Sequence, residues 1–434
     1  MNTKKHFLLF ALICSISMHA QNILTLENAI EIALKNNYDI KIAKNELNID
    51  EINNSVGNAG MLPNVNLFVN NNNSLLKTTQ TQADGTQRTL SGAKNMSLNY
   101  GIGLDWTIFD GFKMFAKKEQ LNQMQMQGET EMKRTIYTKI SNVYNLYYQI
   151  VLQELQIAAL DTAMQISIQR LNTAQNRYSI GKASKLEVLN AQVDLNADSS
   201  LLLQQKQILK NVQIQMNELL AQDVQTAFKV QPKFAIDEQV EMNKILDAAV
   251  RQNPDLQYQI LTMNIAEQSL KQVKANRYPV ITVTTGYNFT QSEASLGFIT
   301  QSNGRGVNYG FTASMPIYSG SSQIRNEKIA KIQIDNSLNL IEKQKQSLRA
   351  QIYEAYENYR TNLSLIQLEA NNIKIAEQNI DITLAKFNIG TITNLEFRTA
   401  QQRYVETQLR YSQAQFQTKI YEIKLKELAG SLKM

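Results

Sequence analysis

The sequence predicts a mainly α-helical chain that carries four β-strands and consists of one unit repeated twice. Three observations predict this fold class. The first is an internal duplication with constant spacing. The second is a pair of proline-free stretches, each about 67 residues long, with a helical pattern of apolar residues. The third is a set of four segments in which apolar and polar residues alternate, as they do in strands.

The N-terminus is typical of a secretory signal peptide. Lys4 and Lys5 form a positive region, and Phe7–Ile16 is apolar but too short to span a bilayer as a helix. We expect cleavage after Ala20. The removed segment holds Cys14, the only cysteine, and both histidines. The mature chain is therefore predicted to lack thiolate nucleophiles, histidine triads and Cys/His metal sites, so we expect neither an enzyme nor a resident metal or cofactor.

The charge of the chain argues against nucleic acid as a partner. The formal charge is +6, and it falls to +4 without the signal, which holds two lysines and no acids. This balance is mild and evenly scattered along the chain. No run of eighteen apolar residues follows the signal, so we expect any insertion into a membrane to use a β-barrel and not helices.

The duplication defines the expected domains. Three pairs of residues show it: Asn37 and Asn253 at an offset of 216, Pro63 and Pro279 at the same offset, and Gly181 and Gly390 at an offset of 209. We expect the chain to divide into four parts: a signal peptide at 1–20, a first repeat at 21–221 with a β-hairpin at about 64–109, a connector at 222–242, and a second repeat at 243–434 with a hairpin at about 280–318.

Each repeat begins with a helical stretch, at about Leu26–Gly60 and Asn243–Asn276, that a proline follows. The hairpin comes next. In its longest alternating segment the apolar residues are Leu98, Tyr100, Ile102, Leu104, Trp106 and Ile108. Polar loops are expected to join the strands at Asn70–Asn95 and Thr290–Gly306. An apolar face opposite a face of small polar residues fits a membrane barrel, and it fits an ordinary sheet with one buried face equally well.

The longest helices are expected at about Phe112–Tyr178 and Ser321–Phe387. A helix of that length extends about 100 Å, and part of the second follows a heptad pattern that is typical of a coiled coil. A glycine turn ends each one, and a shorter helix returns to about Leu220 or Leu428.

The strand count predicts a trimer. Four strands cannot close a barrel, and open strand edges do not survive in the hydrocarbon region of a bilayer. Three copies supply twelve strands with no free edge, and three copies of the paired long helices enclose a hollow cylinder. Two copies supply only eight strands, and a barrel of that size is filled by its own side chains.

The sequence resembles the TolC family of outer-membrane efflux and secretion channels. The resemblance rests on the segment LTLENAIEIALKNNYDI, on the duplication, on the junctions IFDG and IYSG, and on the turn YSIGKASKLEVLNAQ with its repeat. It implies a homotrimer with a trimeric α-barrel of coiled-coil helices in the periplasm and a twelve-stranded transmembrane β-barrel in outer-membrane lipid of a Gram-negative bacterium. It also implies a helical tip that binds a periplasmic adaptor protein, which contacts an inner-membrane pump.

The resemblance also implies a constriction at acidic positions one helical turn apart. These positions match Glu396 and Thr399 in the second repeat, where threonine replaces one acid, and Glu187 and Asn190 in the first. Three copies of Glu396 around an axis favour cations and repel each other. We therefore expect at least one of these carboxylates to titrate above the ordinary pKa of about 4.3. The alternative is that Glu396 is an ordinary exposed carboxylate on a helix.

The adaptor surface is expected at the two turns. Its candidate residues are Tyr178, Gly181, Ser184, Leu186, Phe387, Gly390, Thr393 and Leu395. Both glycines are also expected to act as helix C-caps. The function that we predict is an outer-membrane channel subunit of a tripartite efflux pump or a type I secretion system. The alternative is a non-transporting trimeric coiled-coil stalk or adhesin, which explains the heptads but not the hairpins.

Overall fold

The computed structural model describes residues 23–297 and 299–432, so the predicted signal peptide lies outside the described residues. The chain forms two compact units. The first contains residues 23–44, 131–257 and 343–432 of the described chain and is entirely helical apart from its connections. The second contains residues 45–130 and 258–342 and includes all four strands. Each unit therefore combines segments from both halves of the sequence.

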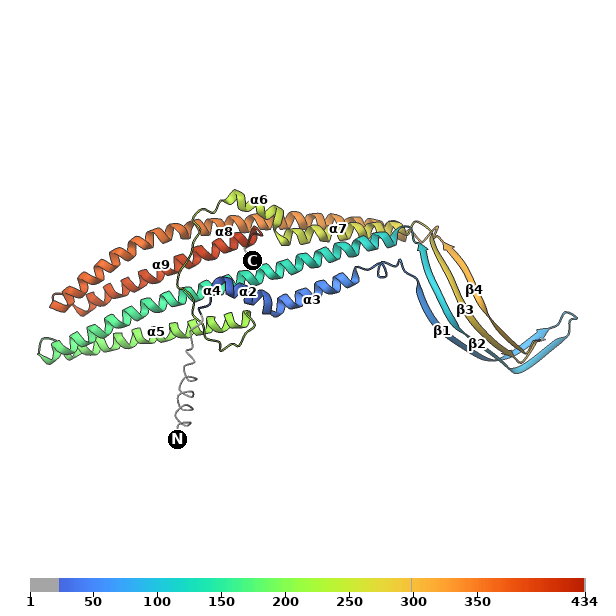
Figure 1. Ribbon diagram of the computed structural model, residues 1–434, viewed down its shortest axis with the longest axis horizontal. Helices are drawn as coiled ribbons and strands as arrows, with labels where there is room; N and C mark the ends of the chain where they lie inside the picture. The colour runs from blue at the N-terminus through green and yellow to red at the C-terminus, as the bar shows by residue number, and fades with distance from the viewer. Residues whose placement is uncertain (1–22, 298, 433–434) are drawn as a thin grey trace, which may run out of the picture. The chain divides into compact units, whose positions relative to one another are not determined.

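Eight helices and four strands make up the described chain (Figure 1). The helices are α2 (Leu26–Asn36), α3 (Tyr38–Asn53), α4 (Lys113–Ser179), α5 (Lys185–Leu219), α6 (Met242–Gln252), α7 (Pro254–Ala275), α8 (Ser322–Ile389) and α9 (Asn394–Leu428). The strands are β1 (Asn64–Thr81), β2 (Gln87–Phe109), β3 (Val280–Ala294) and β4 (Gln301–Ser314). None of the helices in the described residues has a stretch that is both long and apolar enough to cross a membrane.

The prediction of two very long helices is confirmed. Helix α4 has 67 residues and helix α8 has 68. Both begin after a pair of consecutive residues with positive φ, namely Gly111 with Phe112 and Gly320 with Ser321. At Gly111 a Cβ atom would lie 2.4 Å from the carbonyl oxygen of Ala275, so this junction requires glycine for space as well as for conformation.

The prediction of one unbroken helix before each hairpin is wrong. The first is interrupted at Asn37 and the second at Asn253, and both asparagines are buried. The side chain of Asn37 accepts a hydrogen bond from the backbone N–H of Asp39 at 2.9 Å, which caps α3, and donates to the carbonyl oxygen of Leu219 at 2.8 Å. Asn253 caps α7 in the same way and donates to the carbonyl oxygen of Leu428 at 3.0 Å. Each break is thus attached to the end of the helix that completes its own repeat.

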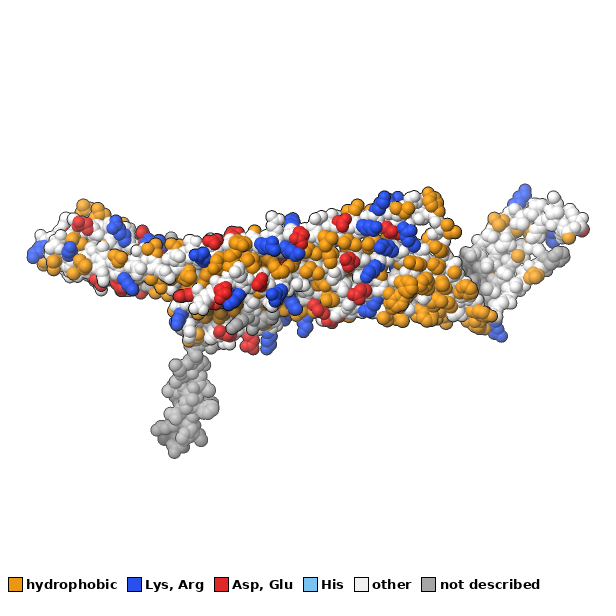
Figure 2. Space-filling model, turned by 90° about the horizontal axis from the view of Figure 1, so that it is seen from above, with side chains coloured by type: hydrophobic (Ala, Val, Ile, Leu, Met, Phe, Trp, Pro, Cys, Tyr) orange, Lys and Arg blue, Asp and Glu red, His pale blue; other side chains and the backbone are white. Residues whose placement is uncertain are grey.

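The four strands form one antiparallel sheet in the order β1-β2-β3-β4. Residues directly opposite each other share a face, so the register divides the sheet into two faces. One, the apolar face, carries most of the large hydrophobic residues: Val65, Leu67, Val69, Leu98, Tyr100, Ile102, Leu104, Trp106, Ile281, Val283, Tyr287, Phe289, Val307, Tyr309 and Phe311. Figure 2 shows hydrophobic side chains gathered over the part of the sheet nearest the helices of this unit, with few toward the hairpin loops.

The other face, the polar face, carries mainly Asn, Ser, Thr and Gly. Its residues are Asn64, Asn66, Phe68, Asn70, Asn72, Ser74, Asn95, Ser97, Asn99, Gly101, Gly103, Asp105, Thr107, Val280, Thr282, Thr284, Gly286, Asn288, Thr290, Ser292, Ala294, Ser302, Gly304, Gly306, Asn308, Gly310, Thr312 and Ser314. The alternation that predicted strands therefore separates two chemically different faces over the paired region.

The predicted polar loops are wrong in extent. Strand β1 continues to Thr81 and β2 starts at Gln87, and β3 and β4 likewise extend into the expected second loop. The Asn- and Thr-rich segment pairs through its backbone, which needs no apolar side chain. A register shift between Leu76 and Thr78, near Gly92 with φ 77°, marks where the β1–β2 ribbon passes beyond its pairing with β3.

The core of the helical unit lies between α2, α4, α5 and the connector. Ile140, Val143, Ile150 and Val151 on α4 are fully or almost fully buried and pack with Met216 of α5. The connector contributes Phe228 and Val230 to the same cluster. Because this burial holds the part of the α4–α5 hairpin that is remote from its turn, it also fixes the direction in which the hairpin extends toward the turn.

Candidate functional site

The two predicted tip turns have the same backbone structure. Gly181 has φ 75° and Gly390 has φ 83°, both in the left-handed region. After Gly181 the N–H of Lys182 donates to the carbonyl oxygen of Arg177 at 2.8 Å, and after Gly390 the N–H of Thr391 donates to that of Lys386 at 3.0 Å. This is the Schellman arrangement, in which glycine closes a helix by satisfying its last carbonyl groups.

The residues after each glycine start the returning helix. Ser184 and Thr393 are the N-caps, and their side chains accept hydrogen bonds from the backbone N–H of Glu187 at 3.3 Å and of Glu396 at 3.2 Å. Glu396 also accepts a hydrogen bond from the backbone N–H of Thr393 at 2.8 Å, which completes a capping box. The site residues Ser184, Thr393 and Glu396 therefore have defined structural roles at the helix starts.

The environment of Glu396 lowers its pKa within the single chain. The backbone N–H of Thr393 is the main cause, and the Thr393 hydroxyl adds to it, because both donate to the ionised carboxylate. Glu396 is exposed. The expected upward shift of the Glu396 pKa concerns three copies around one axis and stays a prediction. For that shift to occur, the repulsion between the three carboxylates must overcome the opposing effect of the cap.

Arg177 links the two turns. Its guanidinium donates to the carbonyl oxygen of Phe387, lies 3.4 Å from that of Asn388, and is 3.6 Å from the carboxylate of Glu187. A Cβ atom on Gly390 would lie 3.2 Å from Arg177 Nη2. The arginine thus joins the end of α8 to the α4–α5 hairpin. Sequence reasoning missed it, although it precedes Gly181 by one helical turn.

Phe387 was expected on the adaptor surface, and the structure contradicts this position. Its side chain is only 1% exposed and stacks on Phe397 with 5.0 Å between ring centroids, while the guanidinium of Arg177 covers it. The large aromatic ring is buried because it fills the space between α8 and α9 just before their turn. Phe387 therefore supports the turn from inside.

The other candidates at the tip are exposed, as a docking surface requires. Leu186 and Leu395 are 65% and 75% exposed, and Tyr178 is 48% exposed. The structure adds Ile180 and Ile389, which directly precede the two glycines and are also largely exposed. Their signal in the sequence was present, because an isoleucine before the turn glycine occurs in both repeats.

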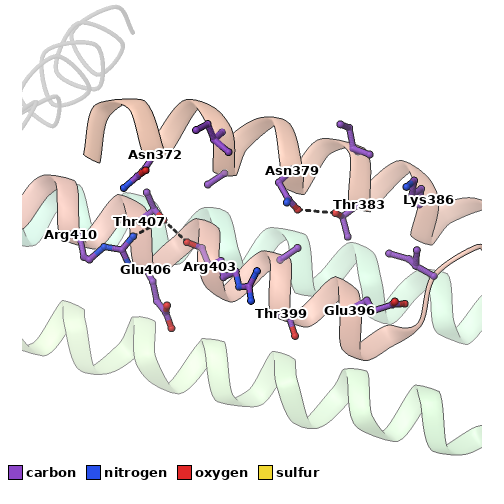
Figure 3. Close-up of a pocket in the computed structure, with 15 residues that line it drawn as sticks. Asn372, Asn379, Thr383, Lys386, Glu396, Thr399, Arg403, Glu406, Thr407 and Arg410 are labelled. Carbon is purple, nitrogen blue, oxygen red and sulfur yellow. Dashed lines mark hydrogen bonds between the residues drawn. The ribbon is translucent and has the colours of Figure 1, made fainter. Parts of the chain in front are cut away.

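A groove of about 660 Å³ runs between α8 and α9 beside the second turn (Figure 3). Glu396 and Thr399 both line it, so the structure brings these two candidates together. Glu187 and Asn190 lie on α5 and do not line it. The groove also carries three cationic side chains, Lys386, Arg403 and Arg410, and a second acid, Glu406. Its formal charge is therefore +1 and not negative, which the sequence motif alone did not indicate.

Farther from the turns along α4, α5 and α9, a buried polar cluster connects the two repeats. Arg398 of α9 donates two hydrogen bonds to Asp198 of α5, at 2.7 and 2.8 Å, and Ser167 donates to the same carboxylate at 2.5 Å. Arg170 is completely buried and pairs with Asp194, while its Nε and Nη1 atoms have no partner among the described residues. Burial lowers the pKa of Arg170, and the hydrogen bond to Asp198 raises that of Arg398.

This cluster fixes the position of α9 against the α4–α5 hairpin. A buried charge that loses its partner is costly, so the bidentate Arg398–Asp198 pair strongly disfavours sliding or separation of these helices. Sequence reasoning could not find it, because the partners lie 200 residues apart and look like ordinary surface charges on helices.

The comparisons with known proteins agree with this architecture. Residues 29–222 and 245–431 match the family model described as outer membrane efflux protein. The outer membrane protein TolC of Escherichia coli (strain K12) is 20% identical over 356 residues, which cover 80% of this chain and 72% of TolC.

Two solved structures share the fold. The outer-membrane channel OprN has a TM-score of 0.77 at 15% identity, covering 94% of this chain and 90% of OprN. The outer membrane protein VceC of Vibrio cholerae has a TM-score of 0.76 at 14% identity, covering 93% of this chain and 96% of VceC.

The family consists of channel proteins and is not a class of enzymes. Its model covers both repeats, with the turns, the groove and the buried cluster described above. These findings favour the channel over the stalk or adhesin. The chain belongs to the outer membrane efflux protein family and is an efflux channel protein of the outer membrane.

Proposed function

We propose that three copies of the chain form a passive duct from the periplasm to the exterior, and that each copy contributes its four strands to a closed twelve-stranded barrel. The supporting observation is the sheet. Its apolar face bears exposed Leu67, Tyr309 and Phe311, and β1 and β4 are its two edges. Pairing β1 of one copy with β4 of the next removes every edge, and three copies leave the polar face toward water.

The mass and conductance of the purified protein test this assembly. We expect a heat-resistant trimer in detergent and discrete single-channel openings in a planar bilayer. A folded monomer or dimer as the only species contradicts the barrel. A trimer without openings contradicts the duct.

The tip and the groove supply the finer part of the proposal. The exposed turn residues dock onto a periplasmic adaptor that links the channel to an inner-membrane pump, for efflux or for type I secretion. Glu396 and Thr399 belong to the constriction, with Glu187 and Asn190 at the matching positions of the first repeat. Support comes from the two exposed leucines at equivalent places, because a duct whose cargo does not leak must meet its partner at this end.

Two substitutions at Glu396 separate charge from helix capping. Glu396→Gln keeps the capping box, because glutamine can accept the same hydrogen bond, but it removes the charge. Glu396→Ala removes both. If the side chain lines the constriction, both variants reduce cation selectivity in a salt gradient, and only the alanine variant weakens the start of α9. Reversal potentials equal to wild type in both variants contradict this position of the constriction.

Docking is tested at Leu186 and Leu395. Replacing both with serine leaves the left-handed caps intact and removes the exposed apolar contact. We expect loss of efflux complementation with unchanged trimer mass and conductance. Undiminished efflux argues against a docking role for these residues.

A further inference from the structure

Over the region where β2 pairs with β3, the polar face of the sheet carries a single charged residue. Of its 28 residues between the helical end and the pairs Ser74–Asn95 and Ser292–Ser302, all but Asp105 are uncharged, and most are Asn, Ser, Thr or Gly. Arg88, opposite Gln80, continues this face only on the β1–β2 ribbon beyond the pairing with β3. Phe68 is the one aromatic residue, and it packs over Gly103, whose Cβ position lies 3.6 Å from the Phe68 ring. Over this region the polar face is therefore electrically neutral except at one position.

Asp105 has a defined place in the register. It lies opposite Asn64, the first residue of β1, and opposite Thr284 of β3. Four residues later β2 ends, and α4 begins after a short turn. Asp105 is exposed, and no ion pair in the described part of the chain involves it. Its carboxylate thus stands on the polar face, at the end of the sheet nearest the helices.

The charges on the apolar face have a different position. Glu293, Arg305 and Lys94 lie on that face toward the hairpin loops, opposite Met96, Phe289 and Leu75 respectively. At this end of the strands a charged side chain on a lipid-facing surface can reach the headgroups. Within the region where β2 pairs with β3, Asp105 is therefore the one charged side chain that can act on what passes along the polar face.

We propose that Asp105 determines the cation preference of the membrane-spanning part of the channel, as a ring of three carboxylates at the inner entrance of the barrel. This inference rests on the proposed trimeric duct. Twelve strands about 4.8 Å apart and tilted about 40° place the barrel backbone about 12 Å from its axis. The carboxylates of the ring then lie about 10 Å from the axis, and the neighbouring residues of the paired region supply no competing charge.

The size of the effect follows from Coulomb's law with screening. Three unit charges about 10 Å away in water, with a Debye length of about 10 Å at 0.1 M salt, enrich monovalent cations at the axis roughly twofold. At 1 M salt the Debye length is about 3 Å and the enrichment disappears. A ring in a wide barrel thus gives a selectivity that salt abolishes. This distinguishes it from a narrow constriction, where ions touch the charged groups.

Reversal potentials of the purified protein in planar bilayers test the proposal. Asp105→Asn keeps the size of the side chain and removes its charge. The ring enriches cations about twofold and depletes anions by the same factor, so we expect Asp105→Asn to lower the cation-to-anion permeability ratio roughly fourfold when the dilute side is at 0.1 M salt. Near 1 M we expect the ratio to stay unchanged. Glu293→Gln is the matched control, because it makes the same change on the apolar face, and it should leave the ratio at its wild-type value. Thr284→Lys, directly opposite Asp105, should shift the ratio in the direction of Asp105→Asn.

The outcomes separate this inference from the duct itself. A wild-type ratio in Asp105→Asn at 0.1 M, in a protein that conducts normally, overturns the role of Asp105 and leaves the duct intact. A reduced ratio that persists at 1 M also overturns it, because it indicates direct contact with ions. A wild-type protein that conducts no current overturns the proposed function and this inference together.

Discussion

Substituting alanine for each turn glycine compares two nearly identical sites that differ in one contact. Both glycines have φ close to 80°, so an alanine at either costs about 1 to 2 kcal/mol for the left-handed conformation. At Gly181 nothing lies within 4 Å of the new Cβ atom. At Gly390 the Cβ would lie 3.2 Å from Arg177 Nη2, the atom that donates to the carbonyl oxygen of Phe387.

Alanine should therefore lower the stability more at Gly390 than at Gly181. Displacing Arg177 weakens a charge-assisted hydrogen bond, and such bonds contribute about 1.5 to 3 kcal/mol. Because Arg177 retains 17% exposure and water replaces part of the loss, we expect an excess of about 1 kcal/mol for Gly390→Ala over Gly181→Ala. Gly181→Asn should cost less than Gly181→Ala, since asparagine tolerates this conformation, whereas Gly390→Asn keeps the clash.

Amide hydrogen exchange measured by mass spectrometry reports the local opening free energy at both turns. Peptides covering 172–187 and 380–395 should show the larger loss of protection for Gly390→Ala, and the excess should vanish when Arg177 is also replaced with alanine. Equal loss at the two turns, or an excess that survives in the Arg177→Ala background, would falsify the argument that Arg177 joins the hairpins.

Three further predictions concern stability. Asn253→Ala should lower the free energy of unfolding by about 1 to 2 kcal/mol, because it removes the cap of α7 and the hydrogen bond to Leu428. Asn253→Asp keeps the cap acceptor and should lose less stability in thermal unfolding. Equal losses of stability contradict the capping role. Arg398→Ala should lower the free energy of unfolding by about 3 kcal/mol, because Asp198 stays buried without its partner. Adding Asp198→Leu should recover part of this stability. A double variant less stable than Arg398→Ala argues against this account. Arg410 donates to Glu369 and lowers the pKa of this carboxyl below 4.5. The hydrogen bond therefore stabilises the folded state above that pH, and this stabilisation is lost as the pH falls through the lowered pKa. The difference in melting temperature between wild type and Glu369→Gln should shrink below pH 4.5, and a difference that stays constant contradicts this prediction.

The sequence predicted the features that depend on neighbouring residues. The absence of proline over each long stretch predicted α4 and α8, and glycine before a Ser or Thr cap predicted the turns at Gly181 and Gly390. The alternation around Tyr100 predicted strands because the period of two is a local signal.

Features that depend on distant partners escaped it. The helical spacing of apolar residues continues through Asn37, so no local signal shows that the helix is interrupted there and that the Asn37 side chain donates to the carbonyl oxygen of Leu219. Arg170 is fully buried, and its partner Asp194 lies on another helix, so its burial has no local signal. The length of the strands was underestimated at Asn70–Asn95, because polar residues pair through the backbone as well as apolar ones do.

The two interrupted helices show that each half of the chain is closed on itself. Asn37 bonds to the end of α5 and Asn253 bonds to the end of α9, so each contact closes a loop within one half of the chain. Neither loop contains the connector at 222–242, and a cut there leaves both closed. Each half of the sequence therefore contains its own hairpin of strands and its own closing contact. Six such halves supply the same twelve strands as three whole chains, so the proposed trimeric barrel repeats its hairpins six times around the axis although it has three chains.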